Sequence, residues 1–382
     1  MEEYTAIKVS CLCGFSRTSL SVPNSSLPLI AVLCHCNTSR HVSGLLYTSY
    51  APLPSAPDDL HGLTEYRSSN DLSRFFCSSC GAHMFGHQKS TDTWKVATGV
   101  LDKSEQLVQF DSQMWIRDTL DGGLSDWLPE LYGSSMVRWK HGRQCSESLP
   151  PGRCTRPGNR HRGEWVEGQN LQAGCHCGGV QFYITPPNEE SSKASSPWSD
   201  LLVPYHVTSS QNPDDVKWWL RVNGTKYLAG TCACKSCRLA SGFDIQSWAF
   251  VPRANILQVT GKALEFGMGT LKRYESSAGT FREFCRVCGA TVFWHCDERR
   301  PDLIDVSVGL LKAESGARAE EWLDWCTSKV SFEEQALNRE LIQGLAKGLE
   351  AWGEGPVSGC HAAASVNRND DSEASMINDH AC

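Results

Sequence analysis

The chain has 382 residues, which is enough for two domains of ordinary size that each bury a core. A hydrophobic content of 40% with 21% charged residues is typical of a soluble globular protein. The formal net charge of −7 argues against nucleic acid as a partner, because contact with phosphates needs an excess of basic residues.

The beginning of the chain, from Met1 to Tyr4, is acidic and lacks the basic and apolar regions of a secretory signal, so we expect no signal peptide. The longest apolar stretch, residues 27–34, is too short to cross a bilayer, and we expect no membrane partner. We therefore expect a cytoplasmic protein, with a nuclear location left open. In such a reducing compartment, clustered cysteines favour metal binding over disulfides.

Three cysteine motifs occur in the same order in two parts of the chain. Six cysteines belong to the first set and seven to the second, out of 19. The first set reads Cys11-x-Cys13-Gly14, Cys34-x-Cys36-x-x-Ser39 and Cys77-x-x-Cys80-Gly81. The second set reads Cys175-x-Cys177-Gly178, Cys232-x-Cys234-x-x-Cys237 and Cys285-x-x-Cys288-Gly289. Closely spaced thiolates suit a tetrahedral zinc ion, and a disulfide framework is the alternative interpretation.

The similarity continues beyond the cysteines and indicates an internal repeat. Residues 34–54 align with 232–252, residues 76–87 with 284–295, and residues 96–101 with 306–311. Identical residues in the first of these alignments include Arg40 and Arg238, Ser43 and Ser241, and Gly44 and Gly242. The first Cys-x-Cys pairs of the two copies are separated by fewer residues than the aligned blocks are. The second copy therefore carries an insertion between Cys177 and Cys232.

Short runs rich in β-branched and aromatic residues predict strands over 179–184, 248–251, 256–259 and 303–308. Their spacing favours a mainly β fold in each copy. Within the insertion, the polar residues 188–196 are predicted to form an exposed loop, and residues 216–222 an added strand.

We expect a first domain at residues 5–137 and a second at 172–332, with the insertion at about 186–228. Residues 138–171 are basic and contain Pro150 and Pro151, which indicates a linker. Good helix formers dominate residues 332–351 and predict a helical extension over 333–354. Residues 355–382 lose the hydrophobic pattern and are expected to form a disordered tail.

Each copy can assemble four thiolates if its Cys-x-Cys pair meets its Cys-x-x-Cys pair. Four thiolates close the coordination sphere of zinc, so we predict two structural zinc sites. Their ligands would be Cys11, Cys13, Cys77 and Cys80 in the first copy, and Cys175, Cys177, Cys285 and Cys288 in the second.

The middle motif of the second copy, Cys232, Cys234 and Cys237, offers three thiolates from one short loop. Three protein ligands leave a fourth position open, which is the pattern of a catalytic zinc. The alternative is a closed site with an additional ligand, for which His295 is a candidate.

In the first copy, Ser39 replaces the third thiolate. A neutral hydroxyl is a poor zinc ligand, so Cys34 and Cys36 should bind zinc weakly. We therefore expect three zinc ions per chain and a first domain that has lost its open site. Rescue of that site by His35 or His41 is left open. The remaining cysteines, Cys145, Cys154, Cys296, Cys326, Cys360 and Cys382, are expected to be ordinary thiols.

The combined motifs resemble the family of glutathione-dependent formaldehyde-activating enzymes, which also includes centromere protein V. The second copy matches the family pattern throughout, including Arg238 after Cys237 and Phe284 before Cys285. The first copy departs from the pattern at Ser39. The resemblance implies two tandem Mss4-like (β-tent) domains, each complete domain holding one four-cysteine zinc and one three-cysteine zinc.

The resemblance also implies carbon–sulfur lyase chemistry on an adduct of glutathione, or of another thiol, with formaldehyde or another aldehyde. Cys232, Cys234 and Cys237 would hold the reactive zinc, and a small-molecule thiol or aldehyde would be the partner. Arg238 could hold a carboxylate of glutathione, with a structural role as the alternative. Two further functions stay open. One is a non-catalytic zinc-binding scaffold, and the other is a related reaction on a larger molecule with the insertion as a wall of the pocket.

Overall fold

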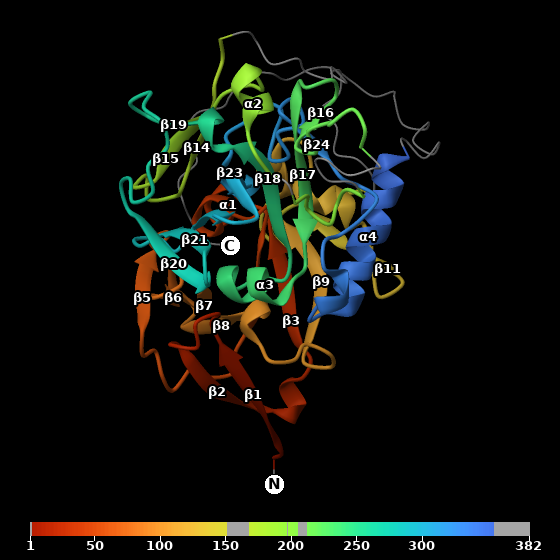
Figure 1. Ribbon diagram of the computed structural model, residues 1–382. Helices are drawn as coiled ribbons and strands as arrows, with labels where there is room; N and C mark the ends of the chain where they lie inside the picture. Colours follow the sequence, from red (N-terminus) through yellow and green to blue (C-terminus); the bar gives the residue numbers. More distant parts are fainter. Residues whose placement is uncertain (1, 151–167, 197, 205–211, 355–382) are drawn as a thin grey trace, which may run out of the picture.

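The computed structural model describes residues 2–150, 168–196, 198–204 and 212–354 (Figure 1). Strands make up most of the regular structure in these residues, which confirms the predicted mainly β class. In each copy the middle and last cysteine motifs lie on one large sheet, and the first motif follows a strand of a smaller sheet. Among the described residues, no helix has the length and apolar character needed to cross a bilayer.

The first copy contains a hairpin and a nine-stranded sheet of order β13-β12-β9-β3-β4-β8-β7-β6-β5. In the hairpin, alternate residues such as Ile7 and Val9 are buried, as a half-exposed strand requires. The strands of the first copy are β1 (Tyr4–Ser10), β2 (Arg17–Pro23), β3 (Leu29–Cys34), β4 (Thr48–Pro52), β5 (Leu63–Arg67), β6 (Leu72–Cys77), β7 (His83–Gln88), β8 (Thr93–Ala97), β9 (Val108–Met114), β10 (Glu130–Leu131), β11 (Ser134–Ser135), β12 (Val137–Trp139) and β13 (Ser148–Leu149).

The second copy contains a three-stranded sheet of order β14-β15-β19 and an eight-stranded sheet. Every residue of β18 is buried, which suits a strand between two neighbours. The strands are β14 (Leu171–Gly174), β15 (Gln181–Ile184), β16 (Leu220–Arg221), β17 (Lys226–Cys232), β18 (Gln246–Pro252), β19 (Ile256–Gln258), β20 (Leu271–Ser277), β21 (Thr280–Cys285), β22 (Thr291–Cys296), β23 (Arg300–Ser307) and β24 (Leu323–Trp325).

The two large sheets share one strand order. It reads β9-β3-β4-β8-β7-β6-β5 in the first copy and β24-β17-β18-β23-β22-β21-β20 in the second. The first pair of each series is parallel, β3 with β9 and β17 with β24. The sequence repeat is therefore a repeat of the fold.

Two matching helices begin within the middle cysteine motifs: α1 (Asn37–Ser43) and α3 (Lys235–Ser241). Each ends at a glycine in the left-handed conformation, Gly44 with φ 83° and Gly242 with φ 91°. A Cβ at Gly44 would lie 2.0 Å from Thr291 O, and one at Gly242 would lie 2.1 Å from His83 O. Glycine is required here because each turn presses against the other copy.

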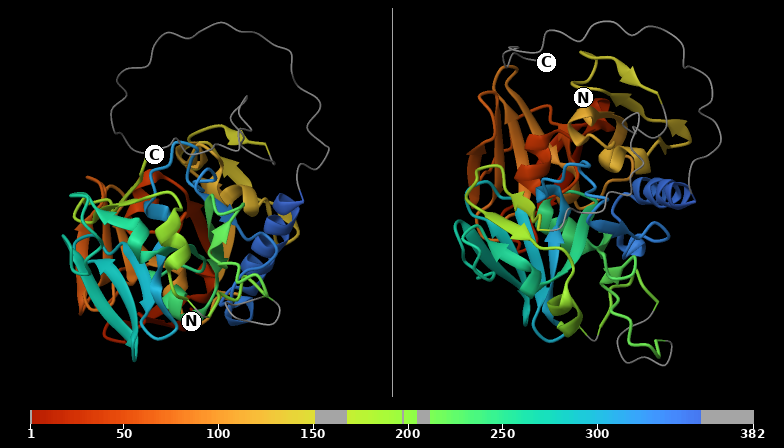
Figure 2. Two further views of the ribbon diagram at one scale, coloured as in Figure 1. Left: turned by 45° about the horizontal axis from the view of Figure 1, so that its top comes forward. Right: turned by 90° about the horizontal axis from the view of Figure 1, so that it is seen from above.

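The two copies pack side by side through reciprocal contacts (Figure 2). The backbone hydrogen bonds join matching positions in both directions: Gly99 N to Gly242 O and Gly309 N to Gly44 O at 2.9 Å, Leu12 N to Leu239 O at 3.1 Å, and His176 N to His41 O at 3.0 Å. One hydrophobic core contains residues of both copies. Such an exchange of equivalent contacts is the pattern of an isologous interface, here within one chain.

The C-terminal helix α4 (Arg339–Gly353) lies against the first copy, although it follows the second in sequence. It begins at Arg339 rather than near residue 333, because the side chain of Asn338 accepts from Leu341 N and caps the helix there. Its buried face consists of Leu341, Ile342, Leu345, Gly348 and Leu349. This face packs on the segment Gly123–Trp127, so the extension connects the two copies.

Three expectations for the connecting segments differ from the structure. The expected linker at 138–171 begins as part of the first sheet, because β12 and β13 extend it beyond β9. Residues 188–196 are not all loop, since α2 (Glu189–Lys193) forms behind a capping box on Asn188. The added strand expected over 216–222 is limited to β16. Residues 151–167 and the expected tail at 355–382 lie outside the described residues.

Candidate metal centres and reaction cavity

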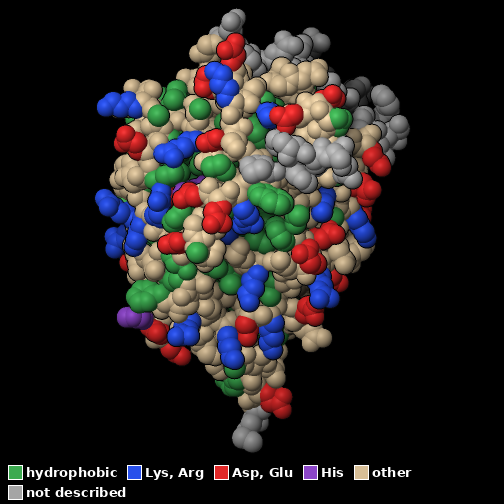
Figure 3. Space-filling model, in the orientation of Figure 1, with side chains coloured by type: hydrophobic (Ala, Val, Ile, Leu, Met, Phe, Trp, Pro, Cys, Tyr) green, Lys and Arg blue, Asp and Glu red, His purple; other side chains and the backbone are tan. Residues whose placement is uncertain are grey.

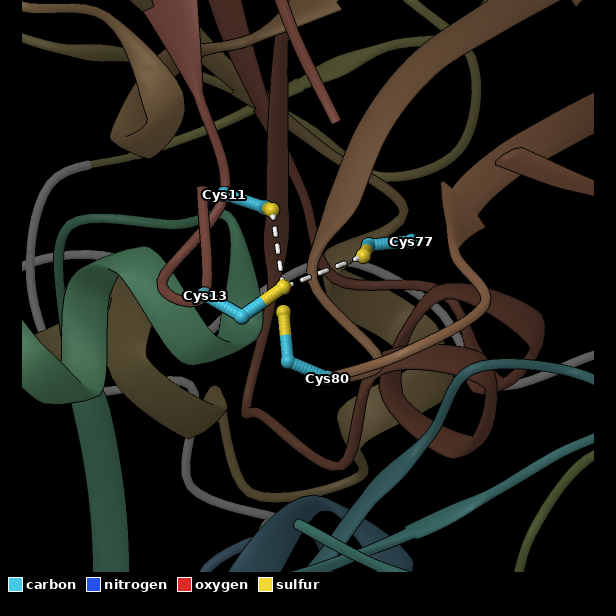
Figure 4. A group of neighbouring side chains, drawn as sticks. All are labelled: Cys11, Cys13, Cys77 and Cys80. Carbon is cyan, nitrogen blue, oxygen red and sulfur yellow. Dashed lines mark hydrogen bonds between the residues drawn. The ribbon is translucent and has the colours of Figure 1, made fainter. Parts of the chain in front are cut away.

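The first four-cysteine group gathers at the end of β6 and in the turn after β1 (Figure 4). The Sγ atoms of Cys11, Cys13, Cys77 and Cys80 all lie within 4.8 Å of one another. The Cys11–Cys13 and Cys13–Cys77 sulfur distances are 3.4 and 3.6 Å. Zinc–sulfur bonds of about 2.3 Å in a tetrahedron place sulfurs about 3.8 Å apart, so the group fits a zinc ion.

The second four-cysteine group is built in the same way from β21 and the turn after β14. The Sγ atoms of Cys175, Cys177, Cys285 and Cys288 lie within 4.8 Å of one another. Cys177 Sγ is 3.5 Å from both Cys175 Sγ and Cys285 Sγ. Both predicted four-cysteine sets are therefore assembled, and each has the donor chemistry of a closed metal site.

The third group consists of Cys232 at the end of β17, Cys234 before α3 and Cys237 in its first turn. Their three Sγ atoms lie within 4.8 Å of one another, and no described His, Asp or Glu joins them as a further ligand. Cys234 Sγ caps α3 by accepting from Cys237 N at 3.2 Å. The loop thus folds so that all three thiols face one point, and a bound ion would keep an open position.

Arg282, on β21, places a positive charge beside this open group. Its guanidinium donates to Cys237 Sγ at 3.7 Å and to Ser236 Oγ at 3.0 Å. Hydrogen bonds from Cys232 and Cys237 hold the pKa of the Cys234 thiol far below its ordinary value. Sequence reasoning missed Arg282. The signal was present, because Arg74 lies at the matching place three residues before Cys77.

The open group faces a cavity of 320 Å³. Its apolar walls come from Trp248, Phe250, Trp294, Leu202 and Phe332, and its polar lining includes Thr231, Ser236, Arg282, Arg299, Arg300, Asp200 and Asp305. In the region where Figure 1 shows β17, β18 and α3, hydrophobic side chains gather among charged ones (Figure 3). This volume and this mixture suit a small polar molecule with an apolar part.

The first copy, the insertion and residues 331–335, all outside the repeated sheet of the second copy, help to complete the cavity. Leu12 reaches it from the first copy, where its backbone is held by Leu239. Asp200 and Leu202 reach it from the insertion. Trp218 and Trp219, also from the insertion, are fully buried in the adjoining hydrophobic cluster. The insertion thus forms a wall of the cavity. This is the position expected for it in the alternative of a reaction on a larger molecule.

An ionic network lies in the cavity wall. Arg300 donates to both oxygens of Asp305, at 3.0 and 3.2 Å, and to Asp200 at 3.2 Å. The Arg300 guanidinium also stacks on Trp218, 5.1 Å from its centroid. Burial raises the pKa of the Asp305 carboxyl to about 7, and Arg300 opposes this shift.

The matching place in the first copy holds Cys34, Cys36 and Ser39. The two sulfurs are 3.5 Å apart, and Ser39 Oγ donates to Cys34 Sγ at 3.3 Å. Arg74 donates to Ser39 Oγ at 3.2 Å. A neutral hydroxyl is a poor zinc ligand, so weak zinc binding at Cys34 and Cys36 stays a prediction.

Four side chains considered as ligands or substrate contacts lie elsewhere. Arg238 donates to the carbonyl oxygens of Gly99 and Leu101 in the first copy, so it serves the interface between copies and not the cavity. His295 bonds Glu283 at 3.3 Å instead of joining the open group. His35 bonds Gln113 at 2.9 Å, and neither His35 nor His41 joins Cys34 and Cys36 in a metal group among the described residues.

Comparison with known proteins agrees with the geometry. The family model described as glutathione-dependent formaldehyde-activating enzyme matches residues 6–118 and again residues 217–328. The two matched segments contain the middle and last cysteine motifs of both copies. No curated protein matches the chain. The three cysteine groups of the structure could hold metal ions, in agreement with zinc.

Proposed function

The chain belongs to the family of glutathione-dependent formaldehyde-activating enzymes, with the family's domain present twice, and from this premise we propose that its second copy is a zinc-dependent carbon–sulfur lyase. The substrate would be the adduct of a thiol, such as glutathione, with a small aldehyde. The first copy would serve as a scaffold that supplies part of the cavity wall.

One observation carries the proposal: three thiols of one loop face a cavity that is large enough for a small molecule. Cys232, Cys234 and Cys237 line the cavity of 320 Å³. The other two cysteine groups each have four sulfurs, which leaves no position for a substrate.

The residues present fit a zinc ion, because three closely spaced thiols are soft ligands of the kind that zinc prefers. Zinc held by Cys232, Cys234 and Cys237 would supply an electrophilic centre that lowers the pKa of a thiol.

The remaining work falls to residues of this chain. Arg282 is buried beside Cys237 and offsets the negative charge of the thiolates. Trp248 and Phe250 give the cavity apolar walls that exclude water. Leu12 and Leu202 close it from the first copy and the insertion.

Turnover of glutathione and formaldehyde, followed by the formation and breakdown of the thiohemiacetal, tests the proposal. We expect Cys237→Ser to lower kcat/KM about 100-fold or more, because it removes a ligand of the open site. The matched control is Ser39→Ala at the equivalent position of the first copy, which should leave kcat/KM unchanged.

A wild-type protein without turnover, or a Cys237→Ser variant as active as the wild type, would contradict the proposal. In the first case a non-catalytic zinc scaffold would explain the two closed groups. In the second case the activity would belong to another part of the chain.

A further inference from the structure

The cavity contains a buried carboxyl group that has no role in the proposed function so far. Asp305 lies on β23, opposite Phe250 of β18 and Trp294 of β22, and it lines the cavity. It is 5% exposed. Among the described residues lining the cavity, Asp305 and Asp200 are the only carboxylates, and no histidine is present.

The repeat provides a comparison within the same chain. Lys95 on β8 lies opposite Pro52 of β4 and Gly86 of β7, which is the register that Asp305 has in the second copy. The copy with three cysteines thus has a carboxylate at this position, between two aromatic residues. The copy with Ser39 has an amine there, between a proline and a glycine. The carboxylate accompanies the third thiol.

The neighbours of Asp305 hold its side chain in place but do not use all of the hydrogen bonds that its carboxylate can accept. A single nitrogen of Arg300 donates to both of its oxygens, which leaves lone pairs toward the cavity. Asp200 is engaged further, because it accepts from Ser331 Oγ at 2.7 Å and from Leu202 N at 3.1 Å. Two further charges act on Asp305: Asp200 raises its pKa, and Arg282, on β21, lowers it.

The joining of a thiol and an aldehyde requires a proton to move from sulfur to oxygen. A general acid–base does this best when it can hold or release the proton near neutral pH. Burial brings Asp305 into that range, with a pKa of about 7.

We propose that Asp305 is the catalytic residue that carries this proton, and that Arg300 and the insertion residue Asp200 position it. The inference rests on the proposed function, since it concerns the same cavity and the same class of substrate.

The step is balanced without an oxidant or reductant. A bond forms between the thiol sulfur and the aldehyde carbon, and the carbon–oxygen π bond breaks. The sulfur's proton passes to the Asp305 carboxylate, which then gives it to the new alkoxide oxygen. The product is a thiohemiacetal, and the carboxylate is regenerated. In the lyase direction the same proton moves from oxygen to sulfur.

The test combines a pH profile with proton counting on the full chain. In Asp305→Asn we expect kcat/KM to fall about 100-fold and to lose its change near pH 7. Asp305→Glu, which keeps the carboxyl group, should retain the pH-dependent change and part of the rate. Lys95→Gln, at the equivalent position of the first copy, should alter neither. Zinc content equal to that of the wild type verifies that each variant is folded.

Calorimetry with reduced glutathione, in buffers of different ionisation enthalpy, gives a readout that does not depend on turnover. When the wild type binds the thiol, it should release about one proton at pH 6, where Asp305 is already protonated, and almost none at pH 8. Asp305→Asn should release most of one proton at both pH values.

The results separate the two proposals. Turnover by the wild type with an unchanged profile in Asp305→Asn would overturn the role of Asp305 alone. No turnover, but a proton release that differs between pH 6 and pH 8 only when Asp305 is present, would overturn the lyase function and keep Asp305 as the group that receives the thiol proton. No binding of glutathione would overturn both.

Discussion

Ser39 and Cys237 occupy the same position in two matching helices, and each accepts a hydrogen bond from an arginine. Arg74 donates to Ser39 Oγ at 3.2 Å, and Arg282 donates to Cys237 Sγ at 3.7 Å. The helix, its cysteine cap and the arginine are thus retained in the first copy. The first copy therefore differs from the three-thiol group in a few side chains, of which Ser39 is the one that would touch a metal.

Replacement of Ser39 by cysteine should therefore restore a metal site. Ser39→Cys places a third thiol beside Cys34 and Cys36, and we expect the chain to bind one additional zinc ion. Native mass spectrometry counts the ions, and Ser39→Ala is the control. An unchanged count in Ser39→Cys would show that more than one residue was lost.

Loss of either closed site should destabilise the whole chain. Cys80→Ser and Cys288→Ser each leave three thiols in a group whose ion would join distant segments, and we expect each to lower the unfolding free energy by several kcal/mol. The effects should be similar, because the groups are built alike. Cys145→Ser, at an exposed residue, should change stability by less than about 0.5 kcal/mol. Thermal unfolding measures all three, and unchanged stability in the first two would argue against structural metal.

The interface between the copies should not accept a side chain at its two helix ends. Gly44→Ala and Gly242→Ala combine a left-handed backbone with a Cβ about 2 Å from a carbonyl oxygen of the other copy. We expect each to cost about 3 kcal/mol or more. Gly133→Ala, with φ 71° and no atom near its Cβ, tests the backbone alone and should cost about 1 kcal/mol. Urea unfolding measures the loss of unfolding free energy in each variant. Equal losses in the three variants would contradict the close contact between the copies at Gly44 and Gly242.

Acid should weaken the fold partly through His83. This residue is fully buried, and burial lowers its pKa to about 3. The folded protein therefore holds the neutral ring. Its contribution to stability is complete above pH 6.5 and is lost as the pH falls toward 3, because the unfolded state binds the proton first. His83→Gln should reduce the pH dependence of unfolding free energy between pH 6 and 4 by up to about 1.4 kcal/mol per pH unit. The exposed His61→Gln is the control, and equal slopes in both variants would refute this assignment.

The spacing of cysteines was enough to predict which thiols come together. Cys11 and Cys77 are distant in sequence, but zinc takes four ligands and the order of the motifs repeats. Together these observations predict that the two thiols belong to one metal site. The strand predicted at 303–308 corresponds to β23 except for its last residue, which follows the strand. This prediction succeeds because β-branched residues favour the extended backbone locally.

The contacts between copies could not be read in the same way. Arg238 follows Cys237 in sequence, but its side chain points to Gly99 of the first copy. Leu12 is the neighbour of a closed cluster in sequence and lines the cavity of the other copy. These contacts depend on how the two sheets pack against each other. The spacing of residues along the sequence does not indicate that packing. Arg282 was missed for another reason, since the sequence does carry a signal for it: Arg74 stands at the matching position before Cys77.

The central claim is that the second copy alone carries an open metal site. Counting zinc per chain by native mass spectrometry, on reduced wild type and Cys237→Ser in parallel, tests it most directly. We predict three ions in the wild type and two in the variant. The same count in both proteins would contradict it.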